Sequence, residues 1–594
     1  MIRSQWFARP RARHLAALAL AFVPGGCAPE TGPGVDLVLV GGTVWTGVDE
    51  APWAEAVAVE GDLVAAVGET GDVLALAGPT TRVIELDGRF VSPGFIDNHT
   101  HFNRAGELLL GVNLLDVADA DGVARRVREA SERLPPGAWM VGGMWGAYEQ
   151  WEASSTGREE AAAGDGVPFD PDRSVIDPVS PANPAILWNW DRSLHLANEA
   201  ALGAAGVDCT WTGVECEAGA PTGRVDRAAA DRIRGAIPAK TMDQRLAEAR
   251  VALARLAENG VTTIFDITPP EQLPVYQELR ERGELTTRVN VRLVLDTWDE
   301  LGHSGIGHGF GDGWIRFNGL KGFVDGIMGN SSARFYEPYL TTGVRGEWRN
   351  PTNTGHVSDR GSGMDPPGNM ERLVFGADSI GLSPRVHAIG DEAVDSLLDI
   401  FERVIETNGP NPDRRFAVIH TQVLRGAQVA ARMAELDIIA EMQPYHTIDD
   451  LRWMEERIGE RARWAYAFGT LEEAGVVLSF GSDWPGTNAA WYTSNPLVGM
   501  YSAVTRQTLD GLPEEGWFPE ERISAESALR AYTVNNAFAS GEEDVKGRIA
   551  KGYYADLVVV DRNPLDVNPP DLRDLRVELT VVGGRIVHDL LGVL

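Results

Sequence analysis

Length, composition and charge limit what this chain can be. At 594 residues it is too long for one small core and suits a large domain with accessory domains. Its formal net charge of -33 argues against a nucleic-acid partner, because a surface that follows phosphates needs a basic patch. We interpret the acidity as a solvated, self-repelling surface rather than as an acidic binding site.

The first 27 residues have the pattern of a secretory signal. Arginines, among them Arg3, Arg11 and Arg13, precede an apolar run at residues 15–23, which is too short to span a bilayer. Cys27 follows two glycines and resembles the lipid-attachment cysteine of a bacterial lipoprotein, although Pro24 stands where that pattern usually has Leu or Val. The prediction is an exported protein of the cell envelope, on the periplasmic or extracellular side, that contacts a membrane only through a lipid on Cys27. Residues 28–34 are predicted to be a tether.

Both ends of the remaining chain are predicted to be rich in β-strands. Short apolar or alternating runs split by glycines fill residues 35–91, and the same texture returns at residues 546–594. Two such segments around a long middle suggest one composite β-sandwich built from both ends.

Strands and helices alternate through the middle, residues 92–545. A helical run that stops at Asn259-Gly260 leads into an apolar strand, and the alternation continues to a strand at residues 476–480. Serial βα units predict an α/β fold, a (β/α)8 barrel of the TIM type. Residues from about 105 to 235 fit the repeat poorly, so we expect an insertion at the barrel mouth.

The first predicted barrel strand ends on two histidines, His99 and His101. Alternate side chains of a strand share a face, so both imidazoles point the same way and form half of a zinc-type site. Taken alone, such a pair is more often two surface or hydrogen-bonded histidines.

Further strands of the predicted barrel end on His387, His420 and Asp483. A single histidine there is usually a core residue, but the carboxyl ends of all barrel strands converge on one face. Four of the eleven histidines and one aspartate in equivalent places therefore indicate a metal centre.

Together these motifs resemble the amidohydrolase superfamily and, more narrowly, amidohydrolase family 3, which includes N-substituted formamide deformylase. The resemblance covers about residues 35–590 and implies a metal-dependent hydrolase on a barrel with a composite sandwich. The motifs that carry it are Pro93-Gly-Phe-Ile-Asp-Asn-His-Thr-His101, Val386-His-Ala-Ile-Gly-Asp391, Ile419-His-Thr-Gln422, Gln443-Pro444, Gly481-Ser-Asp-Trp-Pro485 and the tail from Lys551.

The resemblance also implies a role for each residue at the strand ends. His99 and His101 would bind a buried metal, and His387 and His420 a more exposed one. Asp483 would contact the metal and act as the general base. Zinc is the default ion, although Fe, Mn, Co or Ni suits the same ligands.

Lys321 matches a position at which relatives carry a lysine carboxylated by CO2 that bridges two metal ions. A carbamate makes chemical sense beside a cation, because an ammonium would be repelled. The alternative is an ordinary lysine whose amine pairs with Asp325 or Asp483, and one bound ion would follow.

Substrate contacts are harder to place. The family has a histidine where this chain has Ser193, and His195 lies two positions further on, so it is as readily an ordinary loop residue. Aromatic residues such as Trp139 and Trp151 can wall a pocket, but they as often anchor a loop. The predicted contacts are Trp145, Tyr148, His195, Asp325 and His446.

Cys209 and Cys216 are separated by six residues and lie far from any other cysteine. In an oxidising compartment they are predicted to form a disulfide.

The predicted function is hydrolysis of a non-peptide C–N bond in an amide, formamide or cyclic amide, by a metal-activated hydroxide with Asp483 as base. The alternatives are an ester or lactone hydrolase on the same site, and a solute-binding lipoprotein that keeps the metal without catalysis. A phosphoesterase is disfavoured, because no arginine clamp is evident near the motifs. A small-molecule substrate is the expected partner, with a homodimer as one option.

Overall fold

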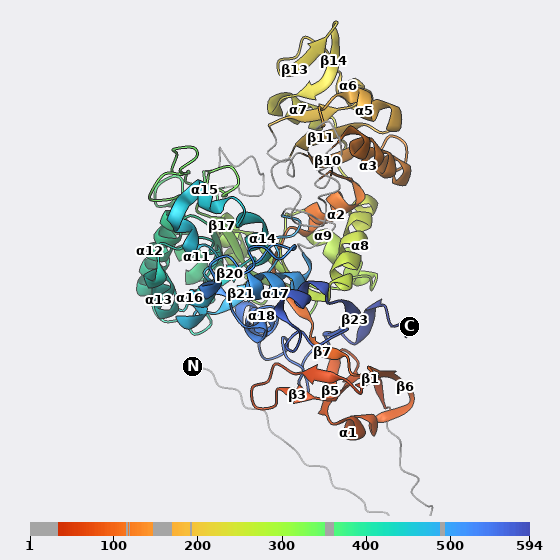
Figure 1. The fold of residues 1–594 in the computed structure, drawn as a ribbon, viewed down its shortest axis with the longest axis vertical. Helices are drawn as coiled ribbons and strands as arrows, with labels where there is room; N and C mark the ends of the chain where they lie inside the picture. The colour runs from red at the N-terminus through yellow and green to blue at the C-terminus, as the bar shows by residue number, and fades with distance from the viewer. Residues whose placement is uncertain are drawn as a thin grey trace, which may run out of the picture.

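The computed structural model describes residues 34–114, 117, 119–145, 169–189, 193–350, 361–486 and 494–594. The predictions on Cys27 and Tyr148 therefore lie outside the described residues. The chain forms a central barrel with a β-rich region at one end and a separate lobe at the other (Figure 1).

The centre is a parallel barrel of eight strands, which confirms the barrel predicted from the sequence. Every pair of neighbours in the eight-stranded sheet runs parallel. Thr100, the last residue of the first strand, forms a parallel bridge with Trp484, which follows the last strand. In sheet order the strands are β21 (Leu478–Phe480), β20 (Ile439–Met442), β19 (Ala417–His420), β18 (Pro384–Ala388), β17 (Ile315–Phe323), β16 (Arg288–Val294), β15 (Val261–Ile267) and β8 (Phe95–Thr100).

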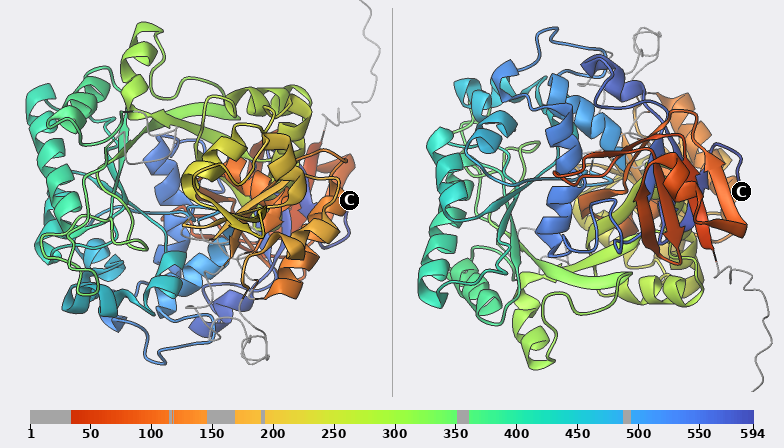
Figure 2. Two further views of the ribbon diagram at one scale, coloured as in Figure 1. Left: turned by 90° about the horizontal axis from the view of Figure 1, so that it is seen from above. Right: turned by 90° about the horizontal axis from the view of Figure 1, so that it is seen from below.

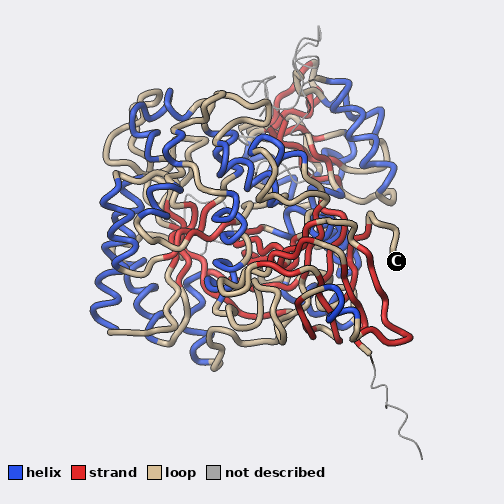
Figure 3. The backbone as a smooth tube through the Cα atoms, turned by 60° about the horizontal axis from the view of Figure 1, so that its bottom comes forward, coloured by secondary structure: helices blue, strands red, loops and turns tan. Residues whose placement is uncertain are grey.

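Helices surround these strands, as Figure 3 shows. Helix α8 is typical: Thr241 and Gln244 form a capping box at its start, and it ends at Asn259 before Gly260, whose φ of +73° suits glycine. The helices of this layer and its loops are α2 (Phe102–Leu110), α8 (Met242–Glu258), α9 (Leu273–Glu281), α10 (Trp298–His303), α11 (Asn369–Ser379), α12 (Asp391–Asn408), α13 (Ala427–Glu435), α14 (Tyr445–Asp450), α15 (Met454–Ile458), α16 (Phe468–Glu473), α17 (Pro496–Thr505), α18 (Ala525–Ala531) and α19 (Val534–Ser540).

The interior of the barrel contains a buried charged cluster. Glu441 on β20 accepts from Arg292 on β16 at 2.7 and 2.8 Å and from Arg385 on β18 at 2.6 Å, and all three side chains are fully buried. Burial opposes the charge of Glu441, but the two guanidiniums outweigh it and lower the pKa of this carboxyl. The cluster therefore holds two positive charges and one negative charge inside the barrel.

Two sheets lie below the barrel and contain strands from both ends of the chain. One sheet has the order β5 (Leu63–Gly68), β4 (Ala56–Glu60), β1 (Val35–Val40) and β6 (Ala77–Glu85). The other has the order β24 (Arg585–Asp589), β23 (Val577–Val582), β22 (Leu557–Val560), β7 (Phe90–Pro93), β2 (Thr43–Trp45) and β3 (Trp53–Ala54). Buried side chains of both sheets share one apolar core. The chain passes from β7 into β8 through Gly94. A side chain does not fit at this position, because a Cβ on residue 94 would lie 2.2 Å from Thr262 Oγ1.

The lobe is a six-stranded sheet with helices, and it stands over one side of the barrel (Figures 1 and 2). In sheet order its strands are β13 (Val214–Glu217), β14 (Ala220–Val225), β12 (His195–Ala197), β11 (Ala185–Asn189), β10 (Met140–Trp145) and β9 (Val112–Asn113). Its helices are α3 (Ala120–Arg133), α5 (Arg173–Ile176), α6 (Glu199–Ala205) and α7 (Arg227–Arg234). Helix α2 packs on α8 and therefore belongs to the layer of helices around the barrel. The lobe accordingly starts after α2.

A disulfide joins Cys209 to Cys216 in the lobe, with an S–S distance of 2.09 Å and a Cα–Cα distance of 6.0 Å. This confirms the predicted pair. Across the described part of the chain, each helix is too short or too polar to cross a membrane.

Replacing Glu441 by Gln tests the charged cluster. The variant leaves Arg292 and Arg385 buried without a countercharge, so we expect a loss of about 3–5 kcal/mol in the free energy of unfolding, measured by urea denaturation. The control is Glu371→Gln, which breaks a half-exposed pair with Arg403 and should cost about 1 kcal/mol or less. Equal losses of unfolding free energy in the two variants would show that the buried cluster contributes no more to stability than an exposed ion pair.

Candidate metal centre

Two histidines and an aspartate meet where the first and last barrel strands come together. His99 lies on β8, and His101 stands between β8 and α2. The Nε2 atoms of His99 and His101 lie 3.3 and 3.2 Å from the same oxygen of Asp483, and the two imidazole centroids are 5.4 Å apart. The two imidazoles therefore point toward the same atom, as predicted from the strand.

Asp483 follows β21 in a tight turn against β8. Its φ is +58°, and its amide donates to the carbonyl of His99 at 2.8 Å. Asp97 accepts from the amides of His99 and Ser482 at 3.0 and 2.9 Å, so one carboxylate fixes both sides of this junction. Gly481 is required here, because a Cβ would lie 2.3 Å from Asn98 Oδ1.

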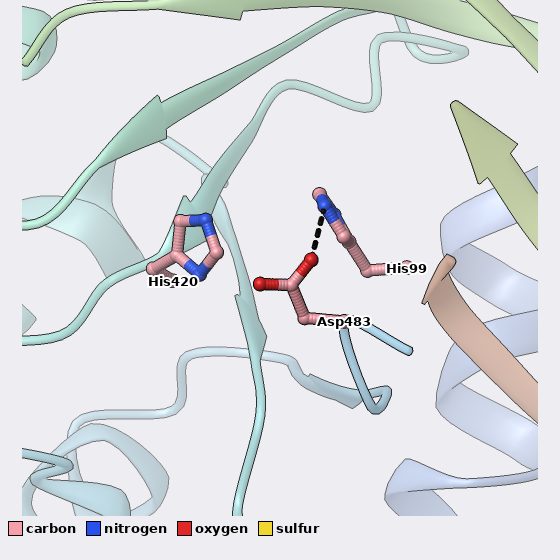
Figure 4. A group of neighbouring side chains, drawn as sticks. All are labelled: His99, His420 and Asp483. Atoms are coloured by element: carbon pink, nitrogen blue, oxygen red, sulfur yellow. Dashed lines mark ion pairs between the residues drawn. The ribbon is translucent and has the colours of Figure 1, made fainter. Parts of the chain in front are cut away.

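His420 completes a possible donor set from the opposite side. It ends β19 with a φ of +75°, and one ligand atom each from His99, His420 and Asp483 lie within 4.8 Å of one another. Figure 4 shows the Asp483 carboxylate between the two imidazoles. A left-handed φ costs a non-glycine residue about 1–3 kcal/mol, and such strain is often kept at functional sites.

Gln443 fixes the orientation of the His420 ring. Its Oε1 atom lies 2.7 Å from His420 Nδ1, so this nitrogen donates and Nε2 keeps its lone pair. Histidines that bind metals usually donate their other N–H to such a partner.

His387 lies beside His420, with ring centroids 4.5 Å apart. Its Nε2 atom is 2.9 Å from the carbonyl of Gly326 and 3.3 Å from Asp325 Oδ1, which leaves Nδ1 for a ligand. Asp325 is fully buried and also accepts from three backbone amides at 2.8–3.1 Å, those of Arg334, Ile389 and Gly390. We therefore assign Asp325 a positioning role behind His387 in place of the predicted substrate contact.

Burial disfavours the charged form of three of these histidines, His99, His387 and His420. It lowers the pKa of His387 to about 3, with a further contribution from the Lys321 ammonium, and it lowers the pKa values of His99 and His420 well below the usual value. Burial opposes ionisation of Asp483, but neighbouring imidazoles, His99 first, outweigh it and hold its pKa well below the usual value. Neutral imidazole nitrogens with a carboxylate oxygen form a donor set that fits a divalent metal such as zinc.

Lys321 lies on β17 and is almost fully buried, with Nζ 4.9 Å from the centre of the Phe323 ring. Its charge acts on all three of the buried histidines His99, His387 and His420, so it belongs to the same centre.

The predicted substrate contacts fall in different places. His446 on α14 belongs to the site: its ring lies 6.5 Å from that of His420 and nearly parallel to it. Trp145 and His195 are buried in the lobe, where Trp145 packs edge-on against Phe169 at 5.6 Å and His195 pairs with β11 and β14. Neither of these two lies in the cluster around Asp483.

Sequence reasoning missed the residues that hold the ligands. Asp266 on β15 accepts from Thr100 Oγ1 at 3.2 Å, from the amide of Phe102 at 2.9 Å and from the Tyr276 hydroxyl at 2.8 Å. It thereby fixes the backbone on both sides of His101. The available signal was its place, because Asp266 lies near the end of a strand that contains no other charged residue.

Comparison with known proteins agrees with this geometry. The sequence pattern of the amidohydrolase family matches residues 82–588. Protein LONG AFTER FAR-RED 3 from Arabidopsis thaliana is 31% identical, over 94% of this chain and 93% of its own. N-substituted formamide deformylase from Arthrobacter pascens is 27% identical, over 94% of this chain and 99% of its own. The crystal structure of an uncharacterized metal-dependent hydrolase from Pyrococcus furiosus covers 89% of this chain and 100% of its own, with a TM-score of 0.67 and 25% identity.

Replacing Gln443 by Leu tests its hold on His420. Without the amide oxygen the ring can rotate or change tautomer, so we expect metal affinity to fall by about 10- to 100-fold in a chelator competition assay. Gln428→Leu, on the exposed surface of α13, is the control and should bind metal like the parent. Unchanged affinity in the Gln443 variant would remove this positioning role.

Proposed function

Because this chain belongs to the amidohydrolase family and is a metal-dependent hydrolase, we propose that it cleaves a carbon–nitrogen bond other than a peptide bond. The substrate would be an amide, a formamide or a cyclic amide. The family match confirms the resemblance seen in the motifs, and the formamide named for the Arthrobacter relative supports this substrate class.

One observation carries the proposal: the donor atoms of His99, His420 and Asp483 converge within 4.8 Å, with His101 on the same carboxylate oxygen. A divalent ion held by these residues would lower the pKa of a water molecule toward ~7 and polarise the substrate carbonyl. Zinc is the ion we propose, since imidazole nitrogens dominate the donor set.

Asp483 supplies the proton transfers. Its carboxylate accepts a proton as the water oxygen bonds to the carbonyl carbon, and it donates that proton to the leaving nitrogen as the C–N bond breaks. The low pKa of Asp483 keeps its carboxyl group ionised at neutral pH. We propose that His446 orients the substrate, and its ring lies 6.5 Å from that of His420, which supports this role.

Lys321 is proposed to be carboxylated and to bridge two ions. Lys321 and Glu441 interact electrostatically, so an ammonium at Lys321 would lie close to the buried Arg292–Glu441–Arg385 cluster. This cluster already has a surplus of positive charge. A carbamate reverses the sign of this side chain. With an ordinary lysine the site would hold one ion.

An ester or lactone hydrolase is the second candidate, because the same attack on a carbonyl serves both substrates. A metal-containing binding protein is the third, and the placement of Asp483 disfavours it, since a binder needs no base.

We also propose that the protein is exported and anchored through a lipid on Cys27. The charged and apolar pattern of residues 1–27 supports this. Mass spectrometry of the mature protein should find Cys27 as the first residue, with a diacylglyceryl mass. An unmodified Cys27 would remove the anchor.

Replacing Asp483 by Asn should abolish nearly all turnover, by about 10²- to 10⁴-fold in kcat, because the amide cannot accept the proton. Metal content, measured in parallel, should persist. Asp413→Asn, on an exposed loop, is the control. Near-parental activity of the Asp483 variant would refute its role as base.

Metal content per chain separates the forms of the site. Protein expressed with bicarbonate should contain two equivalents by elemental mass spectrometry and should hydrolyse some of a panel of N-acyl and N-formyl amines. One equivalent would favour an unmodified Lys321. No metal after attempted reloading would contradict the hydrolase and favour the binding protein.

A further inference from the structure

The backbone is strained where β19 ends in the metal centre. His420 and Thr421 are consecutive residues with positive φ angles, +75° and +43°. Neither residue is glycine, so this left-handed turn persists only where its surroundings hold it. Part of that hold is local, because the Thr421 hydroxyl donates to the carbonyl of Val418 at 2.9 Å. Further contacts come from Gln422, the next residue of the chain.

Asp450, the last residue of α14, holds Gln422. Its Oδ2 atom accepts from Gln422 Nε2 at 2.7 Å and from the Tyr466 hydroxyl at 2.6 Å. The amide of Tyr466 donates in turn to the carbonyl of Gln422 at 2.8 Å, so the three residues form a closed set of hydrogen bonds. All three side chains are buried. The segment after His420 is therefore joined to the end of the helix.

The other end of α14 contacts His420 itself. Gln443 lies just before the helix, and its Oε1 atom is 2.7 Å from His420 Nδ1. His446 lies in the first turn, with its ring 6.5 Å from that of His420. Two separated contacts restrict how a helix can rotate against its neighbour, and Asp450 supplies the second of them.

A carboxyl group is costly in this buried place. Burial raises the pKa of Asp450 to about 7, although the hydrogen bonds from Tyr466 and Gln422 favour its ionised form. Both donors are neutral groups, an amide and a phenol. The contribution of Asp450 is therefore better explained by the geometry it fixes. One oxygen that accepts two hydrogen bonds joins two segments, which an apolar side chain cannot do.

We propose that Asp450 is a positioning residue of the metal centre. Through Gln422 it holds the left-handed turn at His420, and through α14 it keeps Gln443 against the His420 ring. The inference rests on the metal-dependent function proposed above and deepens it, because it assigns the support of a ligand to a residue outside the donor set.

The zinc affinity of the full chain, measured by competition with a chelator, tests this role. Asp450→Ala leaves both donors without their acceptor, so we expect the affinity to fall by about tenfold or more. Asp450→Asn should stay within about threefold of the parent, because its amide oxygen can accept the same two hydrogen bonds. Unchanged affinity in the alanine variant, or an equally large loss in the asparagine variant, would overturn the inference.

Asp378→Ala is the matched control for a general loss of stability. Asp378 is also a buried carboxylate that accepts from two residues, Asn408 and Arg414, both at 2.8 Å. It lies on α11, among the helices around the barrel. This variant should unfold at a lower urea concentration and keep the parental zinc affinity. A drop in zinc affinity equal to that of Asp450→Ala would assign the effect to stability alone and overturn the role.

Two further variants separate positioning from misfolding. Gln422→Leu breaks the same link from its other end, so it should weaken zinc binding by about tenfold even if Asp450→Ala does not fold. In the double variant Asp450→Ala/Gln443→Leu, the two losses should be less than additive, because both act through the His420 ring. Parental affinity in Gln422→Leu, or additive losses in the double variant, would contradict the proposed role.

A failure of the proposed function looks different. Because the readout is metal affinity, a protein that binds zinc and hydrolyses none of the amides still decides the role of Asp450. A parent that binds no zinc after attempted reloading contradicts the metal centre and this inference together. A parent that binds zinc, with the same affinity as Asp450→Ala, contradicts this inference alone.

Discussion

The metal centre depends on the junction between the first and last strands of the barrel. His99 lies one residue before the end of β8, and Asp483 follows β21. The buried carboxylate of Asp97 joins the two segments, because it accepts from the backbone amides of His99 and Ser482. The same junction contains Gly481, where no side chain fits. Closure of the barrel therefore does more than remove exposed strand edges, because it brings the proposed base and a proposed metal ligand together from opposite ends of the barrel sequence.

Beneath this junction, the interior of the barrel contains charged side chains that position a strand end instead of adding stability. Barrel cores are usually filled by branched aliphatic side chains, whereas here Arg292, Arg385 and Glu441 occupy the interior. A buried ion cluster rarely stabilises more than well-packed apolar side chains would. It does fix geometry: Arg292 also donates to the carbonyl of Asn98 at 2.9 Å, directly before His99. We infer that the cluster supports the strand end on which the ligand sits.

The sequence was sufficient for the barrel and its strand ends, because both follow from local patterns. Apolar strands alternate with helices, and a histidine at a strand end must face the common mouth. The lobe residues Trp145 and His195 could not be placed in this way, since an insertion has no fixed register against the barrel. The pairing of Trp348 with Asp325 could not be predicted for a related reason, because no local pattern marks a contact between residues so far apart in the chain.

Asp325 couples the candidate metal centre to the loop that follows β17. Its side chain holds His387 and accepts the amide of Arg334, while its backbone bridges to Trp348. A shift of this loop would therefore also move the support of His387. Most loops at a barrel mouth can vary without touching the chemistry below, but this one shares a buried carboxylate with it. The position of this loop and the orientation of His387 are consequently constrained together on this side of the site.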